Sequence, residues 1–155
     1  ILMNIDSCRV ETQKHIENVR KYIRVFTDKL TTRGVVHDAT KLESPEAELF
    51  AEHTEQLNGI TYGSDEYKAQ LEALKPALAH HYATYRHHPE HFPNGVNDMN
   101  LVDLVEMIAD WKASTLRHQD GNLLKSIEIN AERFHMSDQL KQILINTARM
   151  LDEGE

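Results

Sequence analysis

Apolar residues recur every three or four positions along most of this chain. One such stripe consists of Leu101, Leu104, Val105, Ile108 and Trp111. This spacing places the side chains on one face of an α-helix. The 155 residues include only 6 Gly and 4 Pro, few for a β-sandwich or barrel with many turns. The pattern therefore predicts an all-α protein in which each helix buries one face.

Helix-ending residues divide the pattern into about six or seven helices. The expected helices cover about residues 7–31, 35–41, 45–57, 65–86, 101–117, 123–134 and 138–151, with a loop over 60–63. Ser137 and a residue between Asn97 and Asn100 are expected to act as N-caps. Because no repeat, linker or low-complexity tract interrupts the pattern, residues 1–155 are expected to form a single helical bundle domain.

Charge and apolar runs limit the partners of the chain. The net charge of -8 argues against a broad surface for long nucleic acid. A small anionic substrate stays open, because a bound cation can reverse the local field. No apolar run approaches the roughly 20 residues that span a bilayer, and no signal peptide is visible. We therefore expect a cytoplasmic protein with no membrane partner.

Histidine is concentrated in one region of the chain. Five of the 10 histidines lie between residues 80 and 91, and an adjacent His37-Asp38 pair precedes them. Imidazole and carboxylate groups suit Mn, Fe, Co, Ni or Zn. We expect donors from several helices to converge on such an ion. The candidates are His15, His37, Asp38, the histidines of the 80–91 region and Asp110.

Several of these candidates also have an ordinary structural interpretation. His15 shares the apolar face of its helix, where a core histidine is the alternative to a ligand. Asp110 has apolar neighbours, and burying an unpaired charge there is costly. It either faces an ion or lies at a solvated edge beside a cation. Lys41, three residues after Asp38, either holds a phosphate oxygen or is solvated. We interpret Glu46 as an ordinary acid in the first turn of a helix.

The histidine-rich region is expected to divide into ligands and supporting residues. His81 continues the apolar stripe of its helix and is the better ligand candidate. His88 precedes Pro89, where the helix should end at the rim of a site. The remaining three either bind substrate, support the ligands from outside or form an exposed polar surface: His80, His87 and His91.

The order of these residues resembles that of the HD-domain metal-dependent phosphohydrolase superfamily over about residues 10–115. Residues 37–41, His-Asp-Ala-Thr-Lys, are similar to its His-Asp-x-Gly-Lys signature, with Thr40 in place of glycine. His80-His81 followed by Phe-Pro-Asn-Gly at 92–95 is similar to a region of the HD-GYP subgroup, but shorter. Ala109-Asp110 resembles the pair that supplies the last ligand. Segments 86–92 and 103–113 also resemble an uncharacterised HD-like family of bacteria and phages.

This resemblance implies an HD-like fold and a metal-dependent reaction. The implied ligands of one divalent ion are His15, His37, Asp38 and Asp110, and those of a second ion include His81 and His88. The ion would be Mn, Fe, Zn, Co, Ni or Mg, and it would activate water and polarise a phosphoryl oxygen. Asp38 would orient or deprotonate the water, and Lys41 would contact the phosphate. The expected function is hydrolysis of a small phosphate ester, with a nucleotide as the favoured substrate.

Two other functions use the same residues. A di-iron pair in an HD-like site can support oxygen-dependent cleavage, and a histidine-rich second site suits iron. A helical domain stabilised by a metal can also bind a nucleotide or a protein without catalysis, if protein ligands fill every coordination position. The sequence leaves open the substrate, the number of ions and the choice between monomer and homodimer.

Overall fold

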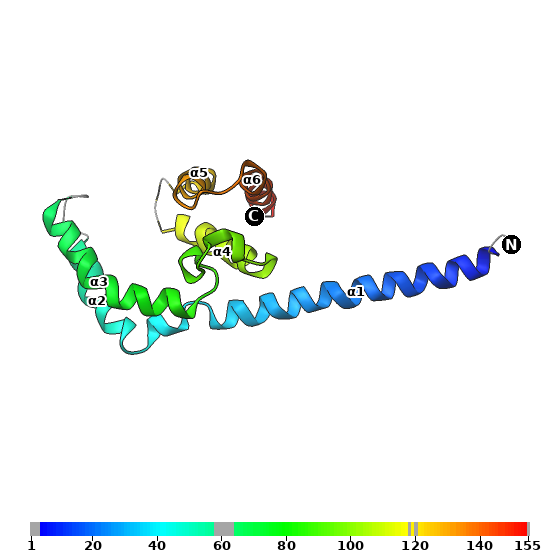
Figure 1. The fold of residues 1–155 in the computed structure, drawn as a ribbon, viewed down its shortest axis with the longest axis horizontal. Helices are drawn as coiled ribbons and strands as arrows, with labels where there is room; N and C mark the ends of the chain where they lie inside the picture. The colour runs from blue at the N-terminus through cyan, green and yellow to red at the C-terminus, as the bar shows by residue number, and fades with distance from the viewer. Residues whose placement is uncertain (1–3, 58–63, 118, 120, 155) are drawn as a thin grey trace. The chain divides into compact units, whose positions relative to one another are not determined.

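The computed structural model describes residues 4–57, 64–117, 119 and 121–154. Within these residues the chain forms six α-helices and three short 3₁₀ helices, and no strand (Figure 1). The predicted all-α class is confirmed. The expected loop over 60–63 lies outside the described residues. The chain divides into two compact units, residues 1–36 and 37–155. The predicted single-domain organisation stays a prediction.

The first unit consists of helix α1 (Ile5–Val36). None of its residues is buried in the described part of the chain. The helix passes the expected end near residue 31 and continues through Gly34. A glycine inside a helix costs only about 1 kcal/mol relative to alanine, so the neighbouring turns can carry the helix across it. A separate helix over 35–41 was expected, but it does not form.

The second unit contains the remaining elements. In chain order these are η1 (Ala39–Leu42), α2 (Glu46–Leu57), α3 (Asp65–Thr84), η2 (Pro89–His91), η3 (Gly95–Asp98), α4 (Leu101–Thr115), α5 (Leu123–Arg133) and α6 (Asp138–Glu153). Asn100 caps α4 in a capping box with Asp103, and Ser137 caps α6, as the sequence predicts. Helix α3 ends at Thr84, slightly earlier than expected.

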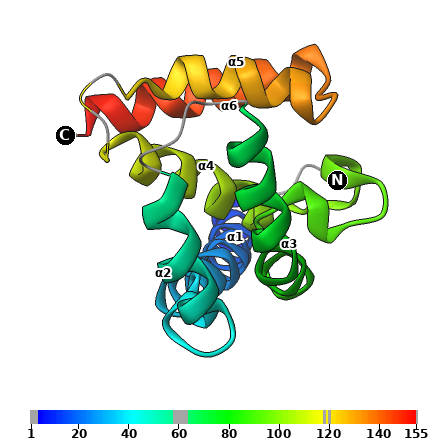
Figure 2. The ribbon, with the colours of Figure 1, turned by 90° about the vertical axis from the view of Figure 1, so that its left-hand side faces the viewer.

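The main apolar core lies among α4, α5 and α6. Met107, Ile127 and Ala148 have no exposed surface, and Ile108 and Leu144 are also buried. Figure 2 shows α5 and α6 side by side, next to α4. Helices α2 and α3 form a second pair that packs along its length (Figure 1). The η1 turn contacts the end of α3 through Thr40 and Tyr85, and the turn after α3 contacts α4 through Arg86 and Asp103.

No helix in the described residues combines the length and the apolar character needed to cross a membrane.

Candidate metal centre

A short turn presents His37 and Asp38. Asp38 has a left-handed backbone with φ of 53°, a conformation that aspartate tolerates better than most residues. The next residues are tied to both neighbouring helices. The Thr40 backbone N–H donates to the Tyr85 hydroxyl at 2.7 Å, and the Thr40 hydroxyl donates to Glu46 Oε1 at 2.8 Å. These bonds hold the turn against α2 and the end of α3.

Three histidines come from the end of α3 and the turn that follows. His81 lies on α3, His87 in the turn, and His88 immediately before Pro89, where an extended backbone is favoured. His81 and His87 are each 1% exposed. The Arg86 guanidinium donates to both carboxylate oxygens of Asp103 on α4, at 3.1 and 2.9 Å. This bidentate pair ties the turn to α4.

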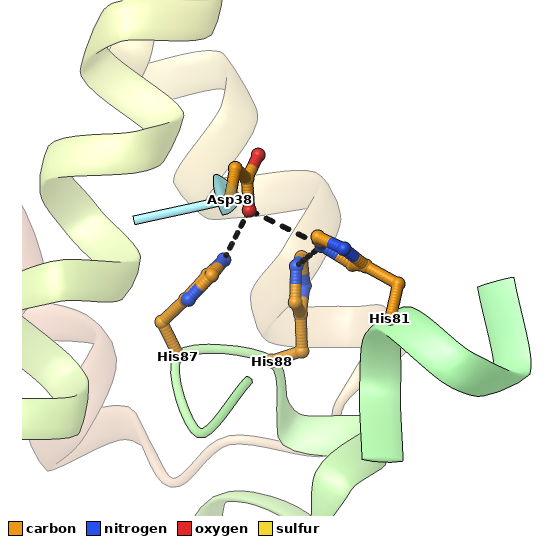
Figure 3. A group of neighbouring side chains, drawn as sticks. All are labelled: Asp38, His81, His87 and His88. Carbon is orange, nitrogen blue, oxygen red and sulfur yellow. Dashed lines mark hydrogen bonds and ion pairs between the residues drawn. The ribbon is translucent and has the colours of Figure 1, made fainter. Parts of the chain in front are cut away.

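The first donor group, which we call the Asp38 group, contains Asp38, His81, His87 and His88 (Figure 3). Asp38 Oδ1 lies 3.2 Å from His81 Nε2 and 3.5 Å from His87 Nε2. His81 Nε2 lies 2.9 Å from His88 Nε2. Ligands bound about 2.1 Å from one ion, at tetrahedral or octahedral angles, lie about 3.0–3.4 Å apart. The spacing of these atoms therefore suits a single divalent ion.

The second donor group, the Asp110 group, contains His37, His87 and Asp110. His37 Nε2 lies 3.6 Å from Asp110 Oδ1 and 3.7 Å from Asp38 Oδ2. His87 belongs to both groups. One Nε2 lone pair binds one ion, so His87 would hold an ion in one of the two groups and not in both at once.

Some donor atoms in these groups are buried without a hydrogen bond. Three such atoms have no hydrogen-bond partner within the described residues: Asp38 Oδ1 and the two ring nitrogens of His87. All three lie at ion-pair distance from another ionisable group. Such groups are costly to bury because they have lost water without replacement. A divalent ion bonded to Asp38 Oδ1 and His87 Nε2 would satisfy two of these atoms. The donor set therefore fits a metal.

Two buried glutamates lie behind the histidines. Glu46, fully buried, accepts from Nδ1 of His80 at 2.6 Å through Oε1, and its Oε2 lies 3.1 Å from Nδ1 of His81. Glu106 is 7% exposed. Its Oε1 lies 3.0 Å from Nδ1 of His37 and 3.1 Å from Nδ1 of His87. The His37 contact is a hydrogen bond, whereas the His87 contact has ion-pair distance without hydrogen-bond geometry.

The carboxylates of the centre are held in their ionised form. Burial alone would raise the pKa of Asp38, but the close contact with His81, the hydrogen bond from Lys41 and the Lys41 charge together outweigh burial and lower that pKa. Burial likewise opposes ionisation of Asp110, but the interaction with His37 and the charges of His87 and His37 together outweigh burial and lower the pKa of Asp110. The negative charge of the centre favours a cation.

The pKa values of His37 and His88 are shifted in opposite directions. Hydrogen bonds to Asp110 and then Glu106 raise the pKa of His37 to about 10. Burial, followed by the charges of His87 and His81, lowers the pKa of His88 to about 3. In the absence of a metal at neutral pH, His37 is therefore protonated, whereas His88 is neutral and keeps a lone pair for an ion.

The structure brings most of the predicted ligands together. Five of the six lie in the two groups: His37, Asp38, His81, His88 and Asp110. The Lys41 ammonium lies 2.7 Å from Asp38 Oδ2. His15 lies on α1, in the other unit, and is exposed there. Its role as a ligand stays a prediction.

The residues predicted to bind substrate occupy three different environments. His80 is about half exposed and bonded to Glu46, whereas His91 Nδ1 bonds the Tyr82 carbonyl oxygen at 2.8 Å. His87 is buried among the donors. A buried ring with its Nε2 next to Asp38 Oδ1 is better placed to bind an ion than to contact substrate.

Sequence reasoning missed the roles of both glutamates. The interpretation of Glu46 as an ordinary helix acid is wrong, because the side chain is fully buried and bonded to histidines. Its first-turn position gave no signal of this. For Glu106 a signal existed, because Asp103, Glu106 and Asp110 recur at helical spacing along one edge of α4.

No curated protein matches the chain, and no solved structure matches it. Neither comparison tests the resemblance to HD-domain phosphohydrolases, so it stays a prediction. A sequence model described as a family of unknown function, DUF5662, matches residues 4–150, and the chain therefore belongs to that family.

Proposed function

We propose that this protein is a metal-dependent phosphohydrolase that cleaves a small phosphate ester. One observation supports it above the others. Asp38 Oδ1 and the Nε2 atoms of His81, His87 and His88 converge, and two of these atoms are buried with no hydrogen bond to any residue that the structure describes. A divalent ion bound there would lower the pKa of bound water and polarise a phosphoryl oxygen.

The exposure of the donors favours a site that is open on one side. The side chains of Asp38 and Asp110 are 20% and 23% exposed, and that of Lys41 is 39% exposed. His81, His87 and Glu46 lie buried behind them. A catalytic ion needs a coordination position that the protein does not fill, whereas a structural ion has none. This arrangement supports catalysis over a purely structural metal.

Lys41 supplies a cation where a phosphate group would be held. Its ammonium reaches Asp38 Oδ2 from three residues further along the chain. An ammonium beside a metal ligand can bind a phosphoryl oxygen as a point charge and neutralise charge developing in the transition state. Asp38 Oδ2 can accept a hydrogen bond from the attacking water and orient it.

The proposed substrate is small, and a nucleotide is favoured. The net charge of -8 disfavours long nucleic acid, while the ion and Lys41 can neutralise one phosphate group. The choice of a nucleotide rests on the sequence resemblance alone. The cytoplasmic location expected from the sequence also belongs to this proposal.

A panel of nucleotides and sugar phosphates tests the function. Protein loaded with Mn²⁺ or Co²⁺ should release phosphate from at least one member, and Asp38→Ala should abolish the release. Asp65→Ala is the matched control, because the Asp65 side chain is fully exposed on α3. Equal turnover by Asp38→Ala and the unmodified protein would refute the site.

The same preparations separate the alternative functions. Oxygen consumption by iron-loaded protein without phosphate release would favour the di-iron oxygenase. Tight metal binding without either activity, on the full panel, would favour the non-catalytic metal-stabilised domain. Both outcomes would contradict the phosphohydrolase proposal.

A further inference from the structure

Two buried glutamates lie behind the donor groups and contact the ring nitrogens that face away from the ion site. We propose that Glu46 and Glu106 are positioning residues that aim four histidine side chains. This inference rests on the metal site of the proposed function, but not on the reaction catalysed there. Glu46 contacts the rings of His80 and His81, and Glu106 contacts those of His37 and His87. Together the two glutamates contact members of both donor groups.

Glu106 joins the two groups through one oxygen. Its Oε1 lies 3.0 Å from Nδ1 of His37, in the Asp110 group, and 3.1 Å from Nδ1 of His87, which belongs to both groups. A carboxylate oxygen has two lone pairs, one for the hydrogen bond with His37 and a second that faces His87 at ion-pair distance. Removing this carboxylate is therefore expected to weaken both groups.

Glu46 contacts one histidine of the Asp38 group, His81. It is the first residue of α2, and its side chain is fully buried. Its Oε2 lies 3.1 Å from Nδ1 of His81, while its Oε1 accepts from His80 and from the Thr40 hydroxyl. Thr40 stands where the HD-domain signature that this chain resembles has a glycine. Its hydroxyl donates to Glu46 and so helps to fix the carboxylate that contacts His81.

These contacts decide which ring nitrogen faces the ion. A carboxylate that accepts from Nδ1–H keeps the proton on Nδ1 and the lone pair on Nε2. The Nε2 atoms of His81 and His87 are the ones that approach Asp38 Oδ1. Such outer carboxylates also fix the ring plane and raise the basicity of the ligand. An amide at the same position loses the charge and can present its NH₂ group to Nδ1 instead.

The energetic cost of burial supports a role beyond packing. An ionised carboxylate inside a protein needs several compensating hydrogen bonds, and apolar residues of similar volume often serve stability equally well. Burial alone would raise the pKa of Glu46, but bonds from His80, Thr40 and His81 outweigh it and lower that pKa. The negative charge of Glu46 is therefore retained at a position where the carboxylate contacts histidine rings.

Co²⁺ titration of the 155-residue chain tests the role, because Co²⁺ absorption reports both affinity and coordination. Glu106→Gln and Glu46→Gln should each raise the Kd for Co²⁺ by about 10–100-fold and alter the visible spectrum. Glu48→Gln, with the same substitution at an exposed position on α2, should match the unmodified protein. Circular dichroism on each variant establishes that it is folded.

A second measurement uses the unmodified protein without metal, so its result does not depend on whether the variants fold. Nitrogen NMR on the unmodified protein should find His81 as the Nδ1–H tautomer, and an Nε2–H tautomer would overturn the role of Glu46. Folded Glu106→Gln and Glu46→Gln variants with unchanged Co²⁺ affinity and spectrum would overturn the whole proposal. If the unmodified protein binds no Co²⁺, the metal site itself is refuted. Co²⁺ binding without phosphatase activity refutes only the phosphohydrolase.

Discussion

His37 and His88 occupy the same centre in opposite protonation states. His37 is hydrogen-bonded to Glu106 and lies at ion-pair distance from Asp110, whereas His88 faces other histidines and has lost much of its contact with water. A metal competes with protons for imidazole nitrogens. The two residues therefore contribute differently to the pH dependence of metal binding.

Co²⁺ binding to the Asp110 group should release about one proton near pH 7, because His37 must lose the proton that its pKa of about 10 retains. His88, with a pKa of about 3, has none to lose. The apparent affinity should rise about tenfold for each pH unit between about 6 and 9. Calorimetry in buffers of different ionisation enthalpy counts the released protons. Proton-neutral binding, or the same release from His37→Asn, would contradict this assignment.

Lys41→Met should lower kcat on the best phosphate ester by about 10²–10³-fold, the usual effect of removing one transition-state contact. Co²⁺ affinity should not fall, because the ammonium pairs with a ligand oxygen and opposes the charge of the ion. Steady-state kinetics with a Co²⁺ titration measure both. Lys68→Met is the control, since Lys68 forms a similar i,i+3 pair with Asp65 on the surface. Equal kcat for Lys41→Met and the control would exclude the phosphate contact.

Single residues differed in how much of their role the sequence revealed. His37-Asp38 and His81 were recognisable, because an adjacent donor pair and a histidine on an apolar stripe are local patterns. Grouping His87 with the ligands depends on how the turn after α3 folds back, which the Arg86–Asp103 pair determines. Glu46 meets its histidines across 34 and 35 positions in the chain. No local pattern encodes such contacts.

Helices were easier to predict than their exact ends. The starts of α4 and α6 followed from side-chain caps at Asn100 and Ser137. The continuation of α1 to Val36 and the start of η1 at Ala39 did not follow from a local signal. Asp38, just before η1, has a left-handed backbone, and Thr40 within η1 is bonded to Tyr85 and Glu46. Tertiary contacts there override helix propensity.

Ile127→Ala should destabilise the α4–α5–α6 core by about 2–5 kcal/mol, because the side chain has no exposed surface and truncation leaves a cavity. Ile129→Ala on the same helix should change stability by no more than about 0.5 kcal/mol, because that side chain is largely exposed. Urea unfolding followed by circular dichroism gives both values. Equal midpoints for the two variants would contradict the assigned inner face of α5.

At the scale of the whole molecule, both donor groups lie within the second unit. Their members come from the turn before η1, the end of α3 with the following turn, and the middle of α4. Three segments that are distant in sequence would thus be cross-linked by one or two ions. Helices α5 and α6 contribute the apolar core and no donor to these groups.

Metal binding should therefore stabilise this unit most strongly where its donors lie. At a free Co²⁺ concentration a hundredfold above Kd, linkage predicts about 2.7 kcal/mol of added stability. Hydrogen exchange with and without a chelator should show the largest added protection in residues 37–42 and 81–91 and around Asp110, because local opening of these segments breaks metal bonds. Asp38→Ala protein should lose this difference. Added protection confined to α6, or retained in full by Asp38→Ala, would place the bound ion elsewhere.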